Sequence, residues 1–308
     1  MNGGRGARDA MDPAAGFAGL REMPPICPDP VFVIGAPRSG TTVLARSLAE
    51  HSALWASGEN DLLFLLFGNR AVERAFDRAA EAPGRRWVRL ENVTRDEFLA
   101  YVGMGINALI TSRSGGRRWV DHTPLNTWIA GTLADAFPGA RFIHIVRDGR
   151  EVVHSMLNFA RAVPDPAVAQ FLQERVPWAA DMGSACVAWR DHVDAAMEFC
   201  DRHADRALIV RYEDLANAPE GTFEAIHSFL GVAEEPGPAR FLASRRINSS
   251  FRDRPRASAG DVWEEWDAGK RQLFTELAGT TMLRCGYPMS RALGSRHRAA
   301  SAGDGPGA

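Results

Sequence analysis

The segment Val31–Thr42 (VFVIGAPRSGTT) constrains the fold more than any other part of this 308-residue chain. Its first five residues, Val31–Gly35, form a continuous apolar run, which is typical of a β-strand buried on both faces. A turn of glycine, proline and serine follows, and Leu44 and Leu48 then recur at the spacing of a helix. A strand, a tight turn and a helix in succession predict the first unit of an α/β domain.

Three more short apolar runs repeat this order. They are Arg118–Asp121, Arg141–Val146 and Ala207–Arg211. Helical patterns follow them near 125–136, 149–162 and 219–230, and longer helical patterns cover 94–111, 180–203 and 270–284. Strands that alternate with helices predict an α/β fold with a central parallel sheet flanked by helices. Ligands of such folds bind beyond the carboxyl ends of the strands.

Composition narrows the class of partner. The chain is 45% hydrophobic and 24% charged with a net charge of −2, which is ordinary for a soluble protein and argues against nucleic acid as its main partner. Lys270 is the only lysine among the 36 basic residues, so an anion site here needs guanidinium groups, backbone N–H groups and helix ends. The longest apolar run, Leu62–Phe67, is too short for a membrane span, and we expect a cytoplasmic protein without membrane partners.

The cysteines and the chain ends add two expectations. Cysteines 27, 186, 200 and 285 have no zinc-like spacing, which predicts reduced thiols and no metal site. Residues 1–29 and 291–308 are rich in small residues, and we expect poorly ordered tails around one domain over residues 30–290. Nothing in the sequence indicates the oligomeric state.

The turn after the first strand has the pattern of a phosphate cradle. Gly35 and Gly40 stand five positions apart, as in G-x-x-x-x-G-K-[ST], but Thr41 replaces the lysine. Glycines let the backbone wrap an anion, the helix N-terminus offers free N–H groups, and Arg38 places a cation inside the loop. Without the lysine, this cradle suits a phosphoryl or sulfuryl group that is less charged than a nucleoside triphosphate.

A second candidate anion site follows the strand Arg141–Val146. Arg147 closes that strand, and Ser155 lies eight residues later, about two helical turns along. One guanidinium and one hydroxyl at these places can hold a single phosphate from two sides.

Together these segments resemble the sulfotransferases that use 3′-phosphoadenosine-5′-phosphosulfate (PAPS). VFVIGAPRSGTT is similar to the 5′-phosphosulfate loop of that family, and FIHIVRDGREVVHSM is similar to its 3′-phosphate motif, most of all in the tyrosylprotein branch and its bacterial relatives. LIVRYEDLANAP resembles the strand whose tyrosine lies beside the nucleotide. The resemblance runs in order over roughly residues 31–290 and implies a P-loop NTPase-like sulfotransferase fold.

The resemblance also implies roles for individual residues. The residues that would hold the 5′-phosphosulfate are Pro37, Arg38, Ser39, Gly40, Thr41 and Thr42. Those that would contact the rest of the nucleotide are Arg147 and Ser155 at the 3′-phosphate, Tyr212 beside it, and Ser250 in a covering loop. PAPS would be the co-substrate, and no metal is implied.

The acid–base residues depart from the family pattern. Where the tyrosylprotein branch has Gly-Glu-Glu, this chain has Gly-Glu-Asn-Asp, which makes Glu59 the first candidate for the general base and Asp61 the second. His122 stands where relatives often carry a catalytic lysine, and it can act as base or stabilise charge. Arg38 would cancel charge on the leaving phosphate. The sequence leaves open whether Glu59 or His122 is the base.

We therefore expect transfer of a sulfuryl group to a hydroxyl of a small-molecule or glycan acceptor. Protein-tyrosine O-sulfation is an alternative, because acceptor selectivity depends on variable loops. A P-loop kinase or other NTPase, and a catalytically inactive nucleotide-binding protein, are alternatives from other classes.

Overall fold

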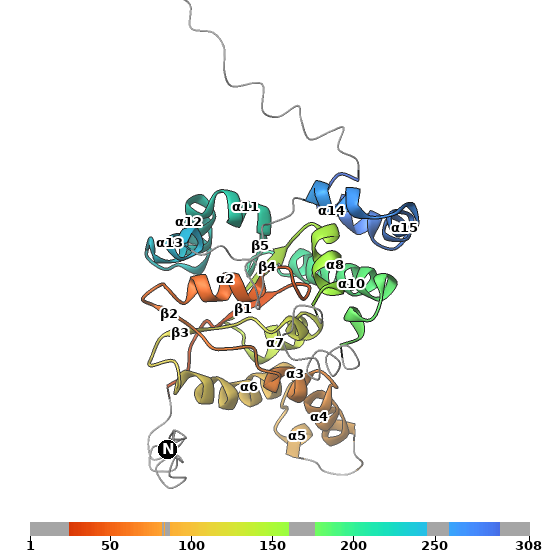
Figure 1. Ribbon diagram of the computed structural model, residues 1–308. Helices are drawn as coiled ribbons and strands as arrows, with labels where there is room; N and C mark the ends of the chain where they lie inside the picture. The colour runs from red at the N-terminus through yellow and green to blue at the C-terminus, as the bar shows by residue number, and fades with distance from the viewer. Residues whose placement is uncertain (1–24, 82, 84–86, 160–175, 245–258, 290–308) are drawn as a thin grey trace, which may run out of the picture.

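A parallel sheet forms the centre of the molecule (Figure 1). The computed structural model describes residues 25–81, 83, 87–159, 176–244 and 259–289. Within these ranges the strands are β1 (Val31–Ile34), β2 (Leu54–Ala56), β3 (Arg118–Asp121), β4 (Arg141–Val146) and β5 (Ala207–Arg211). They lie in the order β2-β3-β1-β4-β5, and all neighbouring pairs are parallel. The predicted α/β class with a parallel sheet is confirmed.

The central strand β1 is apolar on both faces of the sheet. Phe32 and Ile34 pack into one core cluster, while Val31 and Val33 pack into another on the opposite face. Neighbouring side chains of a strand point to opposite faces, so a strand covered on both sides needs apolar residues at every position. This is why the sequence shows a continuous run here rather than an alternation.

Helices cover both faces of the sheet and the region beyond β4 (Figure 1). One face carries α2 (Thr41–Leu48), α11 (Tyr212–Asn217), α12 (Pro219–Leu230) and α13 (Gly237–Ser244). On the other side lie α3 (Leu62–Phe67), α4 (Ala71–Glu81), α5 (Trp87–Leu90), α6 (Arg95–Thr111), the 3-10 helix η2 (Pro124–Ile129) and α7 (Ala130–Ala136). Beyond β4 lie α8 (Gly149–Leu157), η4 (Pro177–Ala179), α10 (Met182–Arg202), α14 (Ala259–Glu265) and α15 (Ala268–Arg284). Of the helices described, none is both long and apolar enough to cross a bilayer.

The longest helices begin at polar caps. Thr94, Asp181 and Asp267 each accept a backbone N–H from the residue three positions later. Such a cap satisfies one of the N–H groups that the first helical turn leaves without a partner. The caps account for helix starts within two residues of the predicted ones.

The structure contains elements that the sequence analysis did not predict. Strand β2 is three residues long, too short for a periodic pattern to reveal. The apolar run Leu62–Phe67 forms α3, which buries Leu63 and Phe67 in the core. Near the N-terminal end of the described chain, Cys27 is buried, and its backbone N–H donates to Asn107 Oδ1 at 2.9 Å. Residues 1–24 and 291–308 of the expected tails lie outside the described residues, as does residue 290.

Candidate functional site

The predicted site residues lie at the carboxyl edge of the sheet. Arg38 follows β1, Glu59 follows β2, and His122 follows β3. Arg147 follows β4, and Tyr212 follows β5 directly. Parallel strands end at the same edge, so residues more than 150 positions apart in the chain come together there.

The loop between β1 and α2 has the geometry of an anion cradle. Gly40 precedes α2 with a backbone φ of 105° and no side-chain cap, so the first N–H groups of α2 have no side-chain acceptor at that position. Ser39 is fully buried, and its Oγ has no hydrogen-bond partner among the described residues. Pro37 and Thr41 are buried in the same turn. An unpaired buried hydroxyl beside a helix N-terminus fits a loop that binds an anion.

The Tyr212 ring sets the shape of this cradle. A Cβ atom added to Gly40 would lie 2.6 Å from Cδ2 of Tyr212. Arg147 also lies against this ring, with its Cζ 4.4 Å from the ring centroid. Tyr212 is itself buried at the start of α11. The tyrosine therefore packs between the phosphate loop and the second predicted anion residue.

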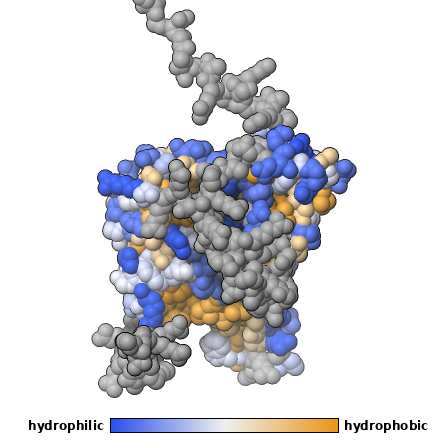
Figure 2. All heavy atoms as spheres, in the orientation of Figure 1, coloured by the Kyte–Doolittle hydropathy of each residue, from blue (hydrophilic) through white to orange (hydrophobic). Residues whose placement is uncertain are grey.

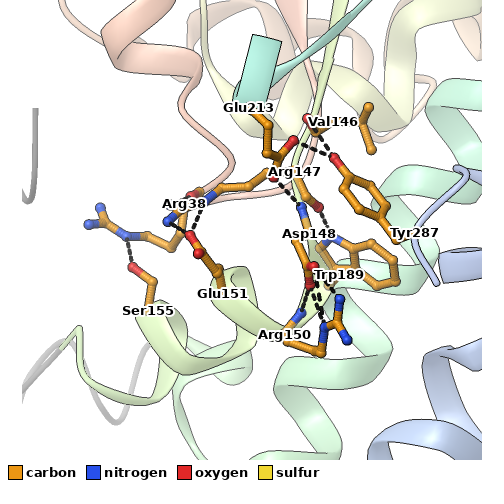
Figure 3. Close-up of polar contacts among 10 residues, drawn as sticks. All are labelled: Arg38, Val146, Arg147, Asp148, Arg150, Glu151, Ser155, Trp189, Glu213 and Tyr287. Carbon is orange, nitrogen blue, oxygen red and sulfur yellow. Dashed lines mark hydrogen bonds and ion pairs between the residues drawn. The ribbon is translucent and has the colours of Figure 1, made fainter. Parts of the chain in front are cut away.

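Arg38 links the phosphate loop to α8. Its Nε donates to Ser155 Oγ at 3.3 Å (Figure 3). Its Cζ lies 5.0 Å from the Phe159 ring centroid. Its backbone φ is 70°, in the left-handed region that residues other than glycine seldom adopt. Burial lowers the pKa of the Arg38 guanidinium, and the nearby charge of Arg147 lowers it further. A bound anion would compensate both effects.

Arg147 is held by three contacts. Its Nε donates to Glu151 Oε2 at 3.1 Å, Nη2 contacts the same oxygen, and Nη1 donates to the carbonyl oxygen of Arg38 at 3.3 Å (Figure 3). A guanidinium has five N–H groups, so two remain for a ligand. The structure thus brings Arg147 and Ser155 together around Arg38. Glu151 is absent from the sequence analysis, although its i+4 spacing from Arg147 is a recognisable signal.

A polar network fixes the end of β4. Asp148 caps α8 and forms a bidentate ion pair with Arg150, while its backbone N–H donates to Glu213 Oε1 at 3.0 Å (Figure 3). Tyr287 donates from its hydroxyl to Glu213 Oε2 at 2.7 Å. Burial and the adjacent Glu213 carboxylate raise the pKa of the Tyr287 phenol, which therefore stays a donor at neutral pH. The network holds the backbone from which Arg147 extends.

Glu59 and His122 lie together on the other side of the phosphate loop. Glu59 Oε1 accepts from Thr42 Oγ1 at 3.1 Å and lies 3.8 Å from His122 Nδ1. His122 is buried, and its Nε2 lies 3.1 Å from the carbonyl oxygen of Ser57. A carbonyl oxygen only accepts, so Nε2 carries a proton. The Glu59 side chain is 49% exposed, which leaves it open to a substrate.

Asn60 has a structural role beside Glu59. Its Nδ2 donates to Asp121 Oδ2 at 2.8 Å, and its backbone N–H donates to Thr123 Oγ1 at 3.1 Å. Burial raises the pKa of Asp121, whereas its hydrogen bonds lower it. The amide thus ties the loop after β2 to the end of β3. Asp61, the second candidate base, stands at the start of α3, and within the described residues it has no hydrogen bond or ion pair to Glu59 or His122.

Two further residues do not belong to the cluster described above. Ser250 lies outside the described residues. His144 is fully buried in β4, where burial lowers its pKa to about 4, as expected of a core histidine. Among the residues that the structure describes, no three His, Cys, Asp or Glu side chains gather where they could bind a metal ion.

Comparison with known proteins places this geometry in context. Residues 30–236 match the family model described as "Sulfotransferase family". Protein-tyrosine sulfotransferase 1 of Danio rerio is 27% identical over 208 residues, which cover 66% of this chain and 53% of the relative. Protein-tyrosine sulfotransferase 2 of Gallus gallus is 28% identical over 220 residues, which cover 69% and 52%. The chain therefore spans about half the length of these curated relatives.

The fold also resembles a solved structure. The crystal structure of sulfotransferase STF9 from Mycobacterium avium superposes with a TM-score of 0.55 at 17% identity, covering 89% of this chain and 81% of that one. At this identity the likeness concerns the fold alone. It agrees with the sheet described above.

Proposed function

Because the chain belongs to the sulfotransferase family, we propose that it transfers the sulfuryl group of PAPS to a hydroxyl, leaving adenosine 3′,5′-bisphosphate. The observation that carries this proposal is the meeting of Arg38, Arg147 and Ser155 between two strand ends. Two guanidinium groups lie close together there, and burial disfavours the charge of one of them. Such a place is suited to a ligand with more than one anionic group.

Different residues would bind the 5′-phosphosulfate and the 3′-phosphate of the donor. The loop Pro37–Thr42 and the N-terminus of α2 would bind the 5′-phosphosulfate, since they offer backbone N–H groups, hydroxyls and Arg38. Arg147 and Ser155 would bind the 3′-phosphate. The fit is supported by the unpaired Ser39 hydroxyl and the two N–H groups that remain on Arg147.

Catalysis would come from alignment and charge stabilisation. PAPS supplies an activated sulfuryl group, and the acceptor oxygen forms a new S–O bond while the bond to the bridging phosphate oxygen breaks. Glu59 would take the acceptor proton, since it is exposed and already touches Thr42 of the loop. His122 would hold Glu59 in place rather than take the proton itself, because the His122 side chain is only 3% exposed. Arg38 and the loop amides would stabilise charge on the leaving phosphate.

The acceptor would be a hydroxyl of a small molecule or a glycan. A tyrosyl peptide is the second candidate, because the two curated relatives carry the name protein-tyrosine sulfotransferase. Both acceptors need the same donor site and the same base.

Calorimetric titration tests the donor site. We expect tight binding of adenosine 3′,5′-bisphosphate without metal and weak binding of ADP, since ADP lacks the 3′-phosphate. Preference for ATP with Mg²⁺ over the bisphosphate would instead indicate a kinase or other P-loop NTPase. Tight bisphosphate binding with no sulfated product from a broad panel of phenols, alcohols, sugars and tyrosyl peptides would indicate an inactive nucleotide-binding protein.

A further inference from the structure

A cavity of about 360 Å³ lies at the β2 edge of the sheet and is lined in part by the loop that carries the proposed base. Trp55 and Trp119 form part of its wall from paired positions on β2 and β3, and Leu109 and Ile110 contribute from α6. Figure 2 shows apolar surface gathered below the sheet, where α3 and α6 lie in Figure 1. The volume is in the range of small-molecule sites. The walls are suited to an apolar body rather than a polar one.

The cavity adjoins the loop that carries the proposed base. Ser57 and Asn60 line it, and they stand on either side of Glu59 in the chain. The Ser57 carbonyl oxygen accepts from His122, which in turn lies 3.8 Å from Glu59. The end of the cavity formed by Ser57 and Asn60 therefore belongs to the loop that carries Glu59.

The polar wall of the cavity is already paired within the protein. Asn60 donates its Nδ2 to Asp121 at 2.8 Å and accepts from the Leu62 backbone N–H at 3.2 Å. Asp121 accepts two further hydrogen bonds, from the Asn126 side chain and the Thr123 backbone. A sugar has several hydroxyls that each need a partner when they leave water. This wall has few groups to offer them, which disfavours a glycan.

Arg113 differs from the other polar residues that line the cavity. It lies just beyond α6 and is exposed, and within the described ranges its guanidinium has no hydrogen bond or ion pair. An arginine at the rim of an apolar cavity is complementary to an anionic group on the occupant.

We propose that this cavity holds the acceptor and that the acceptor is a small aryl or alkyl alcohol with an anionic group that pairs with Arg113. The inference rests on the proposed sulfuryl transfer, because that reaction requires an acceptor hydroxyl beside Glu59. It replaces the choice between small molecule and glycan with a single chemical class.

A matched pair of probes tests the inference by binding alone. Protein saturated with adenosine 3′,5′-bisphosphate is titrated with 3-(4-hydroxyphenyl)propanoate and with its amide, which has the same shape without the charge. We expect the acid to bind about tenfold more tightly than the amide. Arg113→Gln should abolish that ratio and leave amide and bisphosphate affinities within about twofold of the parent protein. Arg78→Gln, which removes an exposed arginine from α4, should preserve the ratio.

A second variant tests the cavity itself. Leu109→Trp places a larger side chain at a partly exposed lining position, and it should weaken both probes while bisphosphate binding stays intact. Equal affinities of acid and amide for the parent protein, or a ratio that survives Arg113→Gln, would overturn the inference. So would methyl glucoside or a tyrosyl peptide binding more tightly than the acid.

The two proposals fail in distinguishable ways. If the protein does not bind the bisphosphate, the proposed donor site is wrong, and the same probe pair titrated into the unloaded protein still decides whether Arg113 recognises an anion. If the bisphosphate binds but the probes do not differ, only the acceptor inference fails.

Discussion

Arg38 donates from its Nε to the Oγ of Ser155 across 3.3 Å, although 117 positions separate the two residues in the chain. The bond joins the loop after β1 to the second turn of α8, which follows β4. Because β1 and β4 are neighbours in the sheet, the two loops emerge side by side at its carboxyl edge. The residues proposed for the two ends of the nucleotide thus form one continuous site.

Arg147→Ala should weaken binding of adenosine 3′,5′-bisphosphate about ten- to a hundredfold, because a charged partner of the 3′-phosphate is lost. Binding of ADP should change by less than about threefold. Calorimetry of both nucleotides measures the difference, with Arg46→Ala on the exposed end of α2 as the control. Equal losses for the two nucleotides would refute the assignment of Arg147 to the 3′-phosphate.

Glu59→Gln should keep bisphosphate binding and lower the transfer rate at least about a hundredfold, since an amide cannot accept the acceptor proton. The amide oxygen can still accept from Thr42, so the loop should keep its shape. Rates with PAPS and the best acceptor of the panel give the comparison, and Asp61→Asn is the matched control. An unchanged rate would remove Glu59 from the role of base.

His122→Gln should lower the transfer rate less than Glu59→Gln does, because we assign His122 a positioning role. A glutamine amide can donate to the Ser57 carbonyl as Nε2 does, but it lacks the second ring nitrogen that faces Glu59. Bisphosphate affinity should stay constant in this variant. A loss as large as that of Glu59→Gln would make His122 the base instead.

Gly40→Ala should destabilise the fold by about 1–3 kcal/mol and abolish bisphosphate binding, since a φ of 105° disfavours any side chain. The new Cβ would also lie 2.6 Å from the Tyr212 ring. Thermal unfolding and calorimetry measure the two effects. Gly221→Ala in α12 is the control, because a Cβ there meets nothing within 4 Å and alanine favours a helix. Combining Tyr212→Leu with Gly40→Ala should recover only the part of the lost stability that is due to the clash with the ring.

The stability of the fold should fall as the pH falls below about 6.5, the pKa of an unfolded histidine. Burial lowers the pKa of His144 to about 4, so the unfolded chain binds more protons than the folded one between these values. The free energy of unfolding should therefore drop by about 2 kcal/mol from this residue between about pH 7.5 and about pH 5. Urea unfolding at the two pH values measures the drop, and His144→Phe should reduce it. An equal drop in parent and variant would contradict the assignment.

Much of the sheet could be predicted from local patterns. The runs Arg118–Asp121, Arg141–Val146 and Ala207–Arg211 form β3, β4 and β5 with these bounds, and the run Val31–Gly35 ends one residue early. Strands buried on both faces leave a strong apolar signal, and the glycine turn marks where the first one ends. Strand β2 was not predicted, because three residues are too few to show a periodic pattern.

The residues of the candidate site were likewise predictable only in part. Arg147 and Ser155 were recognisable because their spacing is local, and Glu151 has an equally local spacing from Arg147, although the sequence analysis did not include it. Glu213 has no signal of its own in the sequence. Its role depends on Tyr287, 74 positions away.

The sequence by itself determined four of the five described strands, the turns and helices that follow them and the chemistry at their ends, because periodicity and turn residues act over a few neighbouring positions. Only the tertiary structure decided which of those groups meet. The strand order β2-β3-β1-β4-β5 places Glu59 beside His122 and Arg38 beside Arg147, and it leaves Arg113 at the rim of an apolar cavity. Contacts between residues far apart in the chain depend on how the helices pack against the sheet, and local sequence patterns do not predict that packing.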